Sequence, residues 1–207
     1  MYKRLYIDID IIKLINKTNG KGDACMINKA INFATVAHSN QTRKGTKIPY
    51  ILHCLEAGTI AAYLSIQNGN IDEDVVCAAI LHDTMEDAFV TYDTLKEAFN
   101  ENVADLVKYQ SEDKSKKWHE RKQATIDFLK TNKSRNVEIA VLSDKLSNMR
   151  SIYRDYQIMQ EELWKKFNAD KKWQHWYYQS IADAMSQVRN TNEFKEYESL
   201  ITDTFQI

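Results

Sequence analysis

The sequence Val75-Val76-Cys77-Ala78-Ala79-Ile80-Leu81-His82-Asp83-Thr84-Met85-Glu86-Asp87 joins an apolar run to an imidazole and three carboxylates. Its first seven residues favour a helix in the protein core. Residues four apart share a helix face, so a continuous helix would stack His82 over Glu86 and Asp83 over Asp87. Burying so much charge is costly unless a partner neutralises it. Because imidazole and carboxylate are both metal ligands, a divalent metal is the simplest partner.

The composition predicts one helical domain. The chain has 207 residues with one proline and five glycines, which leaves long stretches available for helices. This length is enough to bury a substantial core. The net charge of −1 gives no overall attraction to nucleic acid or to an anionic membrane, so neither is expected as a partner. Any binding of anions must therefore come from a local cluster of basic residues.

The cysteines and the N-terminus indicate a reducing, cytoplasmic setting. Cys25, Cys54 and Cys77 are odd in number and widely spaced, which predicts buried, reduced thiols rather than disulfides. Acidic residues interrupt the first apolar stretch, so it does not resemble a signal peptide. No apolar run reaches the ~18–20 residues of a membrane-spanning helix.

Hydrophobic spacing and capping residues predict helices along most of the chain. Asp23 and Asp72 are expected to cap helices, Thr91 begins another, and Asn100 breaks it. We predict an all-α fold with a single domain over residues 1–207. Its motif-bearing core covers about 23–155, and C-terminal helices at about 156–205 pack on that core. A further helix is expected to begin at Asp72 and to carry His82 and Asp83. The other expected helical ranges are 23–38, 50–67, 91–99, 103–107, 118–130, 137–153, 159–167, 173–188 and 194–205.

Two further segments carry metal-ligand residue types in a fixed order. A basic loop, Arg43-Lys44-Gly45-Thr46-Lys47-Ile48-Pro49, leads into a helix whose first turn carries His53. Downstream, Val141-Leu142-Ser143-Asp144-Lys145-Leu146-Ser147-Asn148-Met149-Arg150 places an acid inside an amphipathic helix. Asp144 and Asn148 are four residues apart, so they share a face of that helix.

Together the ordered motifs resemble the HD metal-dependent phosphohydrolase superfamily, through His53, His82, Asp83 and Asp144. The closer resemblance is to its alarmone hydrolase branch, which comprises the hydrolase domain of RelA/SpoT proteins and the small stand-alone alarmone hydrolases. That branch is marked by a basic RKG loop before the first histidine, by an HDxxED form at residues 82–87 and by a DKLxN segment at residues 144–148. The resemblance covers roughly residues 25–155 and implies a helical HD-domain bundle enclosing a metal site.

Three residues depart from the usual pattern of the branch. Met85 stands where Val or Ile is usual, and Ala88 replaces a common Thr. Ser147 occupies a position that is often aromatic or larger, beside the nucleoside pocket that the resemblance implies. None of the three removes a ligand, but Ser147 could alter the fit of the substrate.

The resemblance implies a Mn²⁺ ion with four protein ligands. Two imidazoles and two carboxylates leave open positions on an octahedral ion for water and a phosphate oxygen. Ligand chemistry alone would also allow Fe²⁺, Co²⁺ or Zn²⁺. Glu86 and Asp87 are not needed as ligands, and the family assigns this pair a catalytic role, in orienting or deprotonating water or protonating the leaving oxygen. The implied metal ligands are His53, His82, Asp83 and Asp144.

Candidate substrate contacts follow from the same resemblance. Guanidinium groups bind phosphate through two hydrogen bonds, and ammonium groups add point charge. Arg43 and Lys44 match the substrate-loop residues of the family directly. In the basic run 114–122, Lys117 is a match to a phosphate-binding lysine after a one-residue shift, and Asn148 matches a residue that contacts the nucleoside.

The implied activity is metal-dependent hydrolysis of guanosine tetra- and pentaphosphate (ppGpp and pppGpp) at the 3′-pyrophosphate, giving GDP or GTP plus pyrophosphate. Two alternatives stay open: an HD phosphohydrolase for another phosphorylated nucleotide such as NADPH, and a non-catalytic nucleotide sensor. The sequence contains no glycine-rich phosphate loop and no recognisable Ser or Cys catalytic triad. A homo-oligomer and a functional pairing with a separate alarmone synthetase are also left open.

Overall fold

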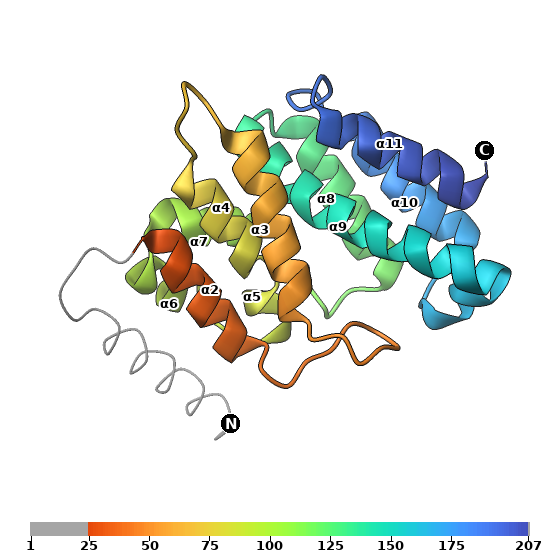
Figure 1. Ribbon diagram of the computed structural model, residues 1–207, viewed down its shortest axis with the longest axis horizontal. Helices are drawn as coiled ribbons and strands as arrows, with labels where there is room; N and C mark the ends of the chain where they lie inside the picture. Colours follow the sequence, from red (N-terminus) through yellow and green to blue (C-terminus); the bar gives the residue numbers. More distant parts are fainter. Residues whose placement is uncertain (1–24, 207) are drawn as a thin grey trace. The chain divides into compact units, whose positions relative to one another are not determined.

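The computed structural model describes residues 25–206, and within them it contains helices and no β-strand (Figure 1). Two isolated β-bridges, Thr42 with Pro49 and Gln67 with Asn70, close short loops. The predicted all-α fold is therefore confirmed for the described residues. Contacts divide the chain into two compact units, one ending at Ser111 and one beginning at Glu112. The cap expected at Asp23 lies outside the described residues.

The first unit is organised around one apolar helix, α4. This helix packs against α2, α3 and α7, and every residue from Val75 to Leu81 is buried. A helix that is apolar on all sides is typical of the centre of a helical bundle. The helices of this unit in its described part are α2 (Met26–Ala37), α3 (Ile51–Ser65), α4 (Glu73–Leu81), α5 (Thr84–Asp87), α6 (Tyr92–Ala98) and α7 (Glu101–Gln110).

Capping side chains set the helix starts that the sequence predicted at residues 72 and 91, and Asn100, predicted to break a helix, also caps the next one. The carboxylate of Asp72 accepts hydrogen bonds from the backbone N–H groups of Asp74 (3.1 Å) and Val75 (3.3 Å). The side chain of Asn100 accepts from the backbone N–H of Val103 at 2.9 Å. These contacts satisfy N–H groups that have no partner inside their own helix.

The helix that Asp72 caps does not continue to Asp87, because α4 stops at Leu81 and α5 begins at Thr84. The hydroxyl of Thr84 donates to the carbonyl of Leu81 at 2.6 Å. Such side-chain bonds compete with the helical ladder. His82 and Asp83 therefore lie in the turn between α4 and α5, and only Asp83, the residue before α5, keeps a helical hydrogen bond from the backbone N–H of Asp87, at 2.8 Å.

A glycine allows α3 to approach α4 closely. A Cβ atom added to Gly58 would lie 2.4 Å from Cγ1 of Ile80, closer than real Cβ contacts permit. Gly58 therefore permits this close approach of α3, which carries His53, to α4, which leads into His82.

The second unit is organised around α9, which packs against α11 and the 3₁₀ helix η1. Its buried side chains include Ile139, Leu142, Leu146 and Met149, spaced three or four residues apart as an inward helix face requires. The range 159–167, predicted to be helical, is mostly a 3₁₀ helix. The helices are α8 (Trp118–Thr131), α9 (Arg135–Met159), η1 (Gln160–Lys166), α10 (Lys171–Ala184) and α11 (Asn192–Phe205).

The cysteines only partly follow the prediction. Cys54 and Cys77 are buried free thiols, whereas Cys25 is exposed, so the expectation for Cys25 is wrong. It lies just before α2, outside the packed helix faces. Burial, with Glu73 and Asp74 nearby, raises the pKa of Cys77 to about 12, which keeps it a protonated thiol. Between residues 25 and 206, no helix is long and apolar enough to cross a membrane.

Candidate active site

Two histidines from neighbouring helices meet inside the first unit. His53 lies in the first turn of α3, and His82 directly follows α4. Both are buried, and their rings meet edge to face with centroids 4.9 Å apart. A ring nitrogen of one lies within 4.8 Å of a ring nitrogen of the other, a separation that a single ion can bridge.

The carboxylate of Asp83 faces both rings. Its Oδ2 lies 2.8 Å from Nε2 of His82 and 3.9 Å from Nε2 of His53. The Asp83 side chain keeps 19% of its surface exposed, so the pair of buried imidazoles opens toward solvent through this carboxylate. The structure thus brings together His53, His82 and Asp83, three of the residues predicted to bind metal.

The hydrogen bonding of His82 shows that this cluster needs a cation. Nδ1 of His82 lies 2.8 Å from the carbonyl oxygen of Ala79. A carbonyl only accepts, so Nδ1 must carry the proton, and in the neutral ring Nε2 then presents a lone pair. That lone pair faces the Asp83 carboxylate, which is also an acceptor. A proton on Nε2 or a metal ion must relieve the repulsion, and a backbone-anchored histidine beside a carboxylate is a good donor set for a divalent metal.

Tyr50 orients the carboxylate, although the sequence did not single it out. Its hydroxyl donates to Oδ2 of Asp83 at 2.5 Å, and its ring packs edge to face against His53. Tyr50 thus contacts both a histidine and the aspartate of the cluster. Its position three residues before His53 is the one sequence signal that could have identified it.

A glutamine holds the short helix that carries Glu86 and Asp87. The Nε2 atom of Gln41 donates to the backbone carbonyl of Asp87 at 2.8 Å, and its Oε1 lies 2.8 Å from Nδ1 of His38. The backbone N–H of Asp87 donates to the carbonyl of Asp83 at 2.8 Å. Glu86 and Asp87 are both half-buried. The two predicted catalytic acids therefore sit on a turn tied to Asp83 and to the loop after α2.

His38 supports this arrangement as a neutral ring. Burial is the main reason that its pKa is lowered from the ordinary value of 6.5, and the hydrogen bond with Gln41 opposes that shift. Because Gln41 donates with its Nε2, its Oε1 accepts from Nδ1 of His38. Nε2 of His38 is buried and finds no hydrogen-bond partner among the described residues. His38 is thus a buried residue that supports the turn carrying Glu86 and Asp87 through Gln41.

The basic loop before His53 is a defined turn. The N–H of Thr46 donates to the carbonyl of Arg43 at 3.0 Å, and Gly45 has a φ of 73°. A positive φ at this third position, after an ordinary Lys44, is the geometry of a type II turn. The guanidinium of Arg43 lies over the Tyr50 ring, 5.7 Å from its centroid. Arg43 is therefore held beside the residue that orients Asp83, while Lys44 is exposed.

Asp144 and Asn148 lie in the second unit, on α9. The Asn148 amide donates to Oδ1 of Asp144 at 2.6 Å, which confirms that they share a helix face. Nζ of Lys145 lies 2.5 Å from Oδ2. Burial acts to lower the pKa of Lys145, but the Asp144 carboxylate and Tyr177 raise it well above its ordinary value. The place of Asp144 in a ligand set with His53 and His82 stays a prediction.

The basic run 114–122 is partly neutralised within the second unit. Arg121 and Lys122 both pair with the carboxylate of Glu112, at 2.9 Å and 2.6 Å. Lys117 is exposed at the start of α8, where its backbone N–H donates to the Glu120 carboxylate at 3.0 Å. Of these three cations, Lys117 alone points into solvent, as a phosphate contact would require.

Comparison with known proteins identifies the family. The family model of the HD domain matches residues 30–169 of this chain. The guanosine-3′,5′-bis(diphosphate) 3′-pyrophosphohydrolase MESH1 of Xenopus tropicalis is 32% identical over 175 residues, which cover 84% of this chain and 90% of that protein. A guanosine-3′,5′-bis(diphosphate) 3′-pyrophosphohydrolase of Aquifex aeolicus is 36% identical over 149 residues, covering 68% of this chain and 19% of that protein.

A solved structure shows the same fold. It belongs to a metazoan ortholog of SpoT, described as hydrolysing ppGpp and acting in starvation responses, and it superposes with a TM-score of 0.70 at 24% identity. The match covers 87% of this chain and 96% of that one. The chain therefore belongs to the HD-domain family, in the group that includes the MESH1 proteins.

Proposed function

We propose that this protein hydrolyses guanosine tetra- and pentaphosphate at the 3′-pyrophosphate, releasing GDP or GTP and pyrophosphate. The observation that carries the proposal is the convergence of two buried imidazoles, His53 and His82, on the Asp83 carboxylate, with Nε2 of His82 only 2.8 Å from that carboxylate. The names of the MESH1 and Aquifex relatives supply the substrate.

The metal in this proposal is Mn²⁺, held by His53, His82, Asp83 and Asp144. Asp144 is included because its motif follows the other two in the order of the family, and because its carboxylate is a ligand type that suits a divalent metal. A bound divalent ion supplies Lewis-acid polarisation of the phosphoryl group. Tyr50 keeps the Asp83 carboxylate oriented toward that site through its hydrogen bond.

Glu86 and Asp87 are the proposed acid–base pair. As a water oxygen bonds to the phosphorus, a carboxylate of the pair takes a proton from that water. As the bond between phosphorus and the 3′-oxygen breaks, the other carboxyl group returns a proton to the 3′-oxygen. The anchoring of Asp87 by Gln41 and Asp83 limits where this pair can move.

The substrate carries many negative charges, whereas the protein has a net charge of −1. The phosphates of the substrate must therefore be held by basic side chains close to the site. Arg43 and Lys44 are the proposed contacts in the first unit, on the turn beside Tyr50. Lys117 is the proposed phosphate contact and Asn148 the proposed nucleoside contact in the second unit.

Incubation of the purified protein with Mn²⁺ and ppGpp tests the proposal. We expect stoichiometric release of GDP and pyrophosphate, with no release when Glu86→Gln replaces the native protein. The variant should still bind Mn²⁺, since Glu86 is not a proposed ligand. Binding of ppGpp without turnover in the native protein would instead identify a nucleotide sensor, and a higher kcat/KM for NADPH would identify the alternative substrate.

A further inference from the structure

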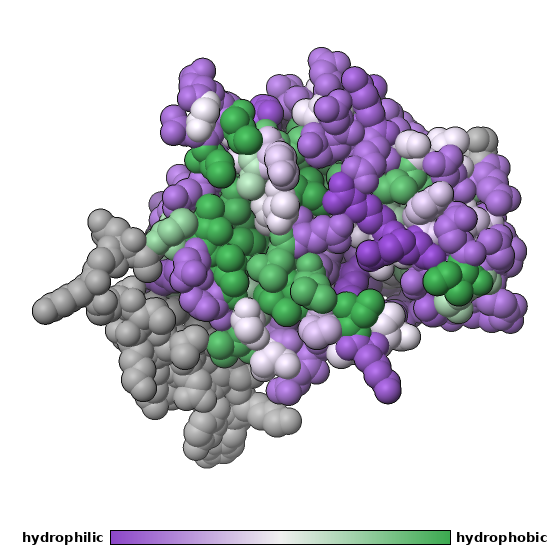
Figure 2. All heavy atoms as spheres, in the orientation of Figure 1, coloured by the Kyte–Doolittle hydropathy of each residue, from purple (hydrophilic) through white to green (hydrophobic). Residues whose placement is uncertain are grey.

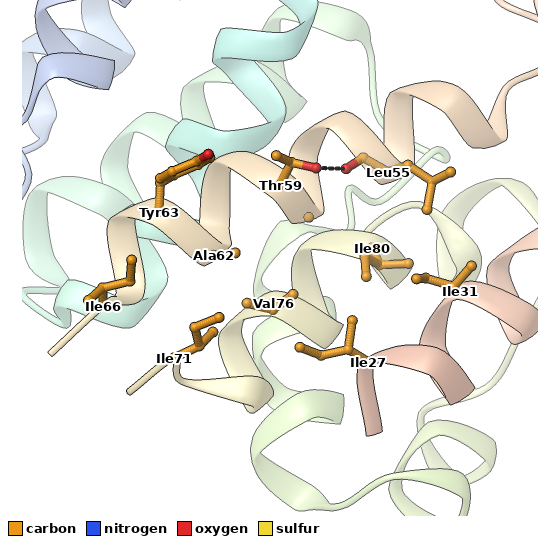
Figure 3. Close-up of a pocket in the computed structure, with 11 residues that line it drawn as sticks. Ile27, Ile31, Leu55, Thr59, Ala62, Tyr63, Ile66, Ile71, Val76 and Ile80 are labelled. Atoms are coloured by element: carbon orange, nitrogen blue, oxygen red, sulfur yellow. Dashed lines mark hydrogen bonds between the residues drawn. The ribbon is translucent and has the colours of Figure 1, made fainter. Parts of the chain in front are cut away.

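An apolar groove crosses the surface of the first unit, between α2, α3 and α4 (Figure 3). Its volume is about 390 Å³. Ile27 and Ile31 of α2 point into it from one side, and Val76 and Ile80 of α4 form its floor. Figure 2 shows the surrounding surface of this unit as an apolar strip along α3 and α4.

Large apolar side chains stand exposed at the rim of this groove. Tyr63 is 68% exposed, Ile66 is 50% exposed and Ile71 is 45% exposed, and all three line the groove. Single exposed apolar residues are ordinary on a protein surface, but a contiguous hollow patch of them marks a place where something binds.

The groove lies on the side of α3 away from the cation site. Its α3 residues include Leu55, Thr59 and Ala62, which recur at the spacing of one helix face. His53 precedes Leu55 by two residues, which turns it by about 200° around the helix axis. An occupant of the groove would therefore not contact the histidines.

We propose that the groove is the docking site of this chain's own N-terminal segment, residues 1–24. The segment contains a dense aliphatic stretch between residues 5 and 15 that a folded protein would bury. Its aliphatic residues are Leu5, Ile7, Ile9, Ile11, Ile12, Leu14 and Ile15.

The described chain begins at one end of the groove. The Sγ atom of Cys25 lies 3.9 Å from Oε1 of Glu73 at the start of α4, between the groove residues Ile71 and Val76. The segment is therefore tethered to the groove, and a tether makes docking intramolecular, with a high effective concentration. A separate partner lacks this advantage.

Length and sequence both allow the segment to fold back. In helical form, residues 5–15 would span about 15 Å, and the groove-lining part of α3 from Leu55 to Tyr63 spans about 12 Å, to which Ile66 after the helix adds further length. Asn19-Gly20-Lys21-Gly22 lies between the aliphatic stretch and Cys25. Asn-Gly sequences favour a turn, which gives the chain a place to reverse.

Photo-crosslinking of the full-length chain tests the proposal directly. p-Benzoylphenylalanine in place of Tyr63 puts the reactive group at the rim, where the exposed native side chain tolerates replacement. We expect crosslinks from position 63 to peptides from residues 1–24. The same group in place of Tyr109, another exposed tyrosine on α7, is the matched control and should give no such crosslink.

Mixing light and isotopically heavy protein before irradiation distinguishes crosslinks within one chain from crosslinks between two chains. Crosslinks within one isotopic chain support the proposal, whereas crosslinks between light and heavy chains would show that a second copy fills the groove and would overturn it. An absence of crosslinks to residues 1–24 would also overturn it.

A second measurement uses substitutions in the segment itself. Ile9→Asp with Ile12→Asp should release the segment and produce a several-fold rise in the fluorescence of a hydrophobic dye at the groove. Lys13→Glu with Lys17→Glu changes charge but removes no aliphatic residue, so it should leave the fluorescence unchanged. Equal fluorescence in the native protein and the Ile9/Ile12 variant would contradict the proposal.

Discussion

The hydroxyl of Tyr50 donates a hydrogen bond of 2.5 Å to Oδ2 of Asp83, a residue 33 positions further along the chain. The same carboxylate faces His82 at 2.8 Å and His53 at 3.9 Å. Tyr50 therefore fixes the orientation of the group on which both histidines converge. Hydrogen bonds of this kind tune both the position and the basicity of a metal ligand.

Replacing Tyr50 by phenylalanine should lower ppGpp hydrolysis without unfolding the protein. The ring and its packing against His53 are kept, and only the hydroxyl that orients Asp83 is lost. Loss of such a supporting hydrogen bond lowers metal affinity or activity by about 10- to 100-fold. Steady-state kinetics across a Mn²⁺ titration measures the loss. Tyr63→Phe is the control, because it removes an exposed hydroxyl on α3 far from His53 and should leave the rate of ppGpp hydrolysis unchanged. An equal loss of activity in both variants would refute the role of Tyr50.

Divalent metal should raise the thermal stability of the protein, and the rise should depend on His82. A ligand that binds only the folded state stabilises it by about 2.7 kcal/mol at a free concentration of one hundred times its Kd. Melting curves in Mn²⁺ and in a chelator measure this difference. His82→Ala should abolish the difference, whereas His119→Ala, at an exposed histidine on α8, should retain it. A metal-induced rise that survives in His82→Ala would place the ion elsewhere.

The buried His38 should make stability fall at mildly acidic pH. Burial lowers its pKa in the folded state, so below the ordinary value of 6.5 the unfolded chain takes up a proton that the folded chain does not. The contribution of this residue is therefore fully present above pH 6.5 and is lost as the pH falls through the lower, folded-state pKa. Denaturant unfolding at a series of pH values should show a shallower loss for His38→Gln than for the native protein. Identical slopes in the native protein and His38→Gln would contradict the prediction.

Glu138 should be essential to the stability of the second unit. This fully buried carboxylate accepts backbone hydrogen bonds from Ser186, at 2.9 and 3.0 Å, and from Gln187, at 2.6 Å. Glu138→Ala removes a fully buried acceptor shared by these N–H groups and by that of the buried Val188, which should lower the free energy of unfolding by about 3 kcal/mol or more. Denaturant titration measures the change. Glu162→Ala is the control, because it breaks an exposed ion pair with Lys165 and such surface pairs contribute little to stability. Similar losses of unfolding free energy in the two variants would show that the buried Glu138 carboxylate contributes no more than a surface carboxylate.

Part of this protein could be predicted from short sequence patterns. The cap at Asp72, the helix start at Thr91 and the shared face of Asp144 and Asn148 follow from interactions a few residues apart, and the structure has all of them. The apolar run from Val75 to Leu81 predicted a core helix because its side chains are apolar in every direction around the axis.

Other features depend on contacts that no local pattern encodes. The helix α4 ends at Leu81, where two side chains form hydrogen bonds with carbonyls of the preceding turn. His82 bonds the carbonyl of Ala79 and Thr84 bonds the carbonyl of Leu81. The roles of Tyr50 and Gln41 depend on partners 33 and 46 residues away. The partial neutralisation of the basic run depends on Glu112, which pairs with both Arg121 and Lys122.

The sequence by itself determined the helical class, the order of the motifs and the residue types that point to a metal-dependent hydrolase, because helix periodicity and ligand chemistry are local properties. Only the tertiary structure decided that His53 and His82 converge on the Asp83 carboxylate and that Tyr50 orients it. The physical reason is that these contacts require α3 and α4 to pack closely at Gly58 and Ile80, and that packing is a property of two helices together.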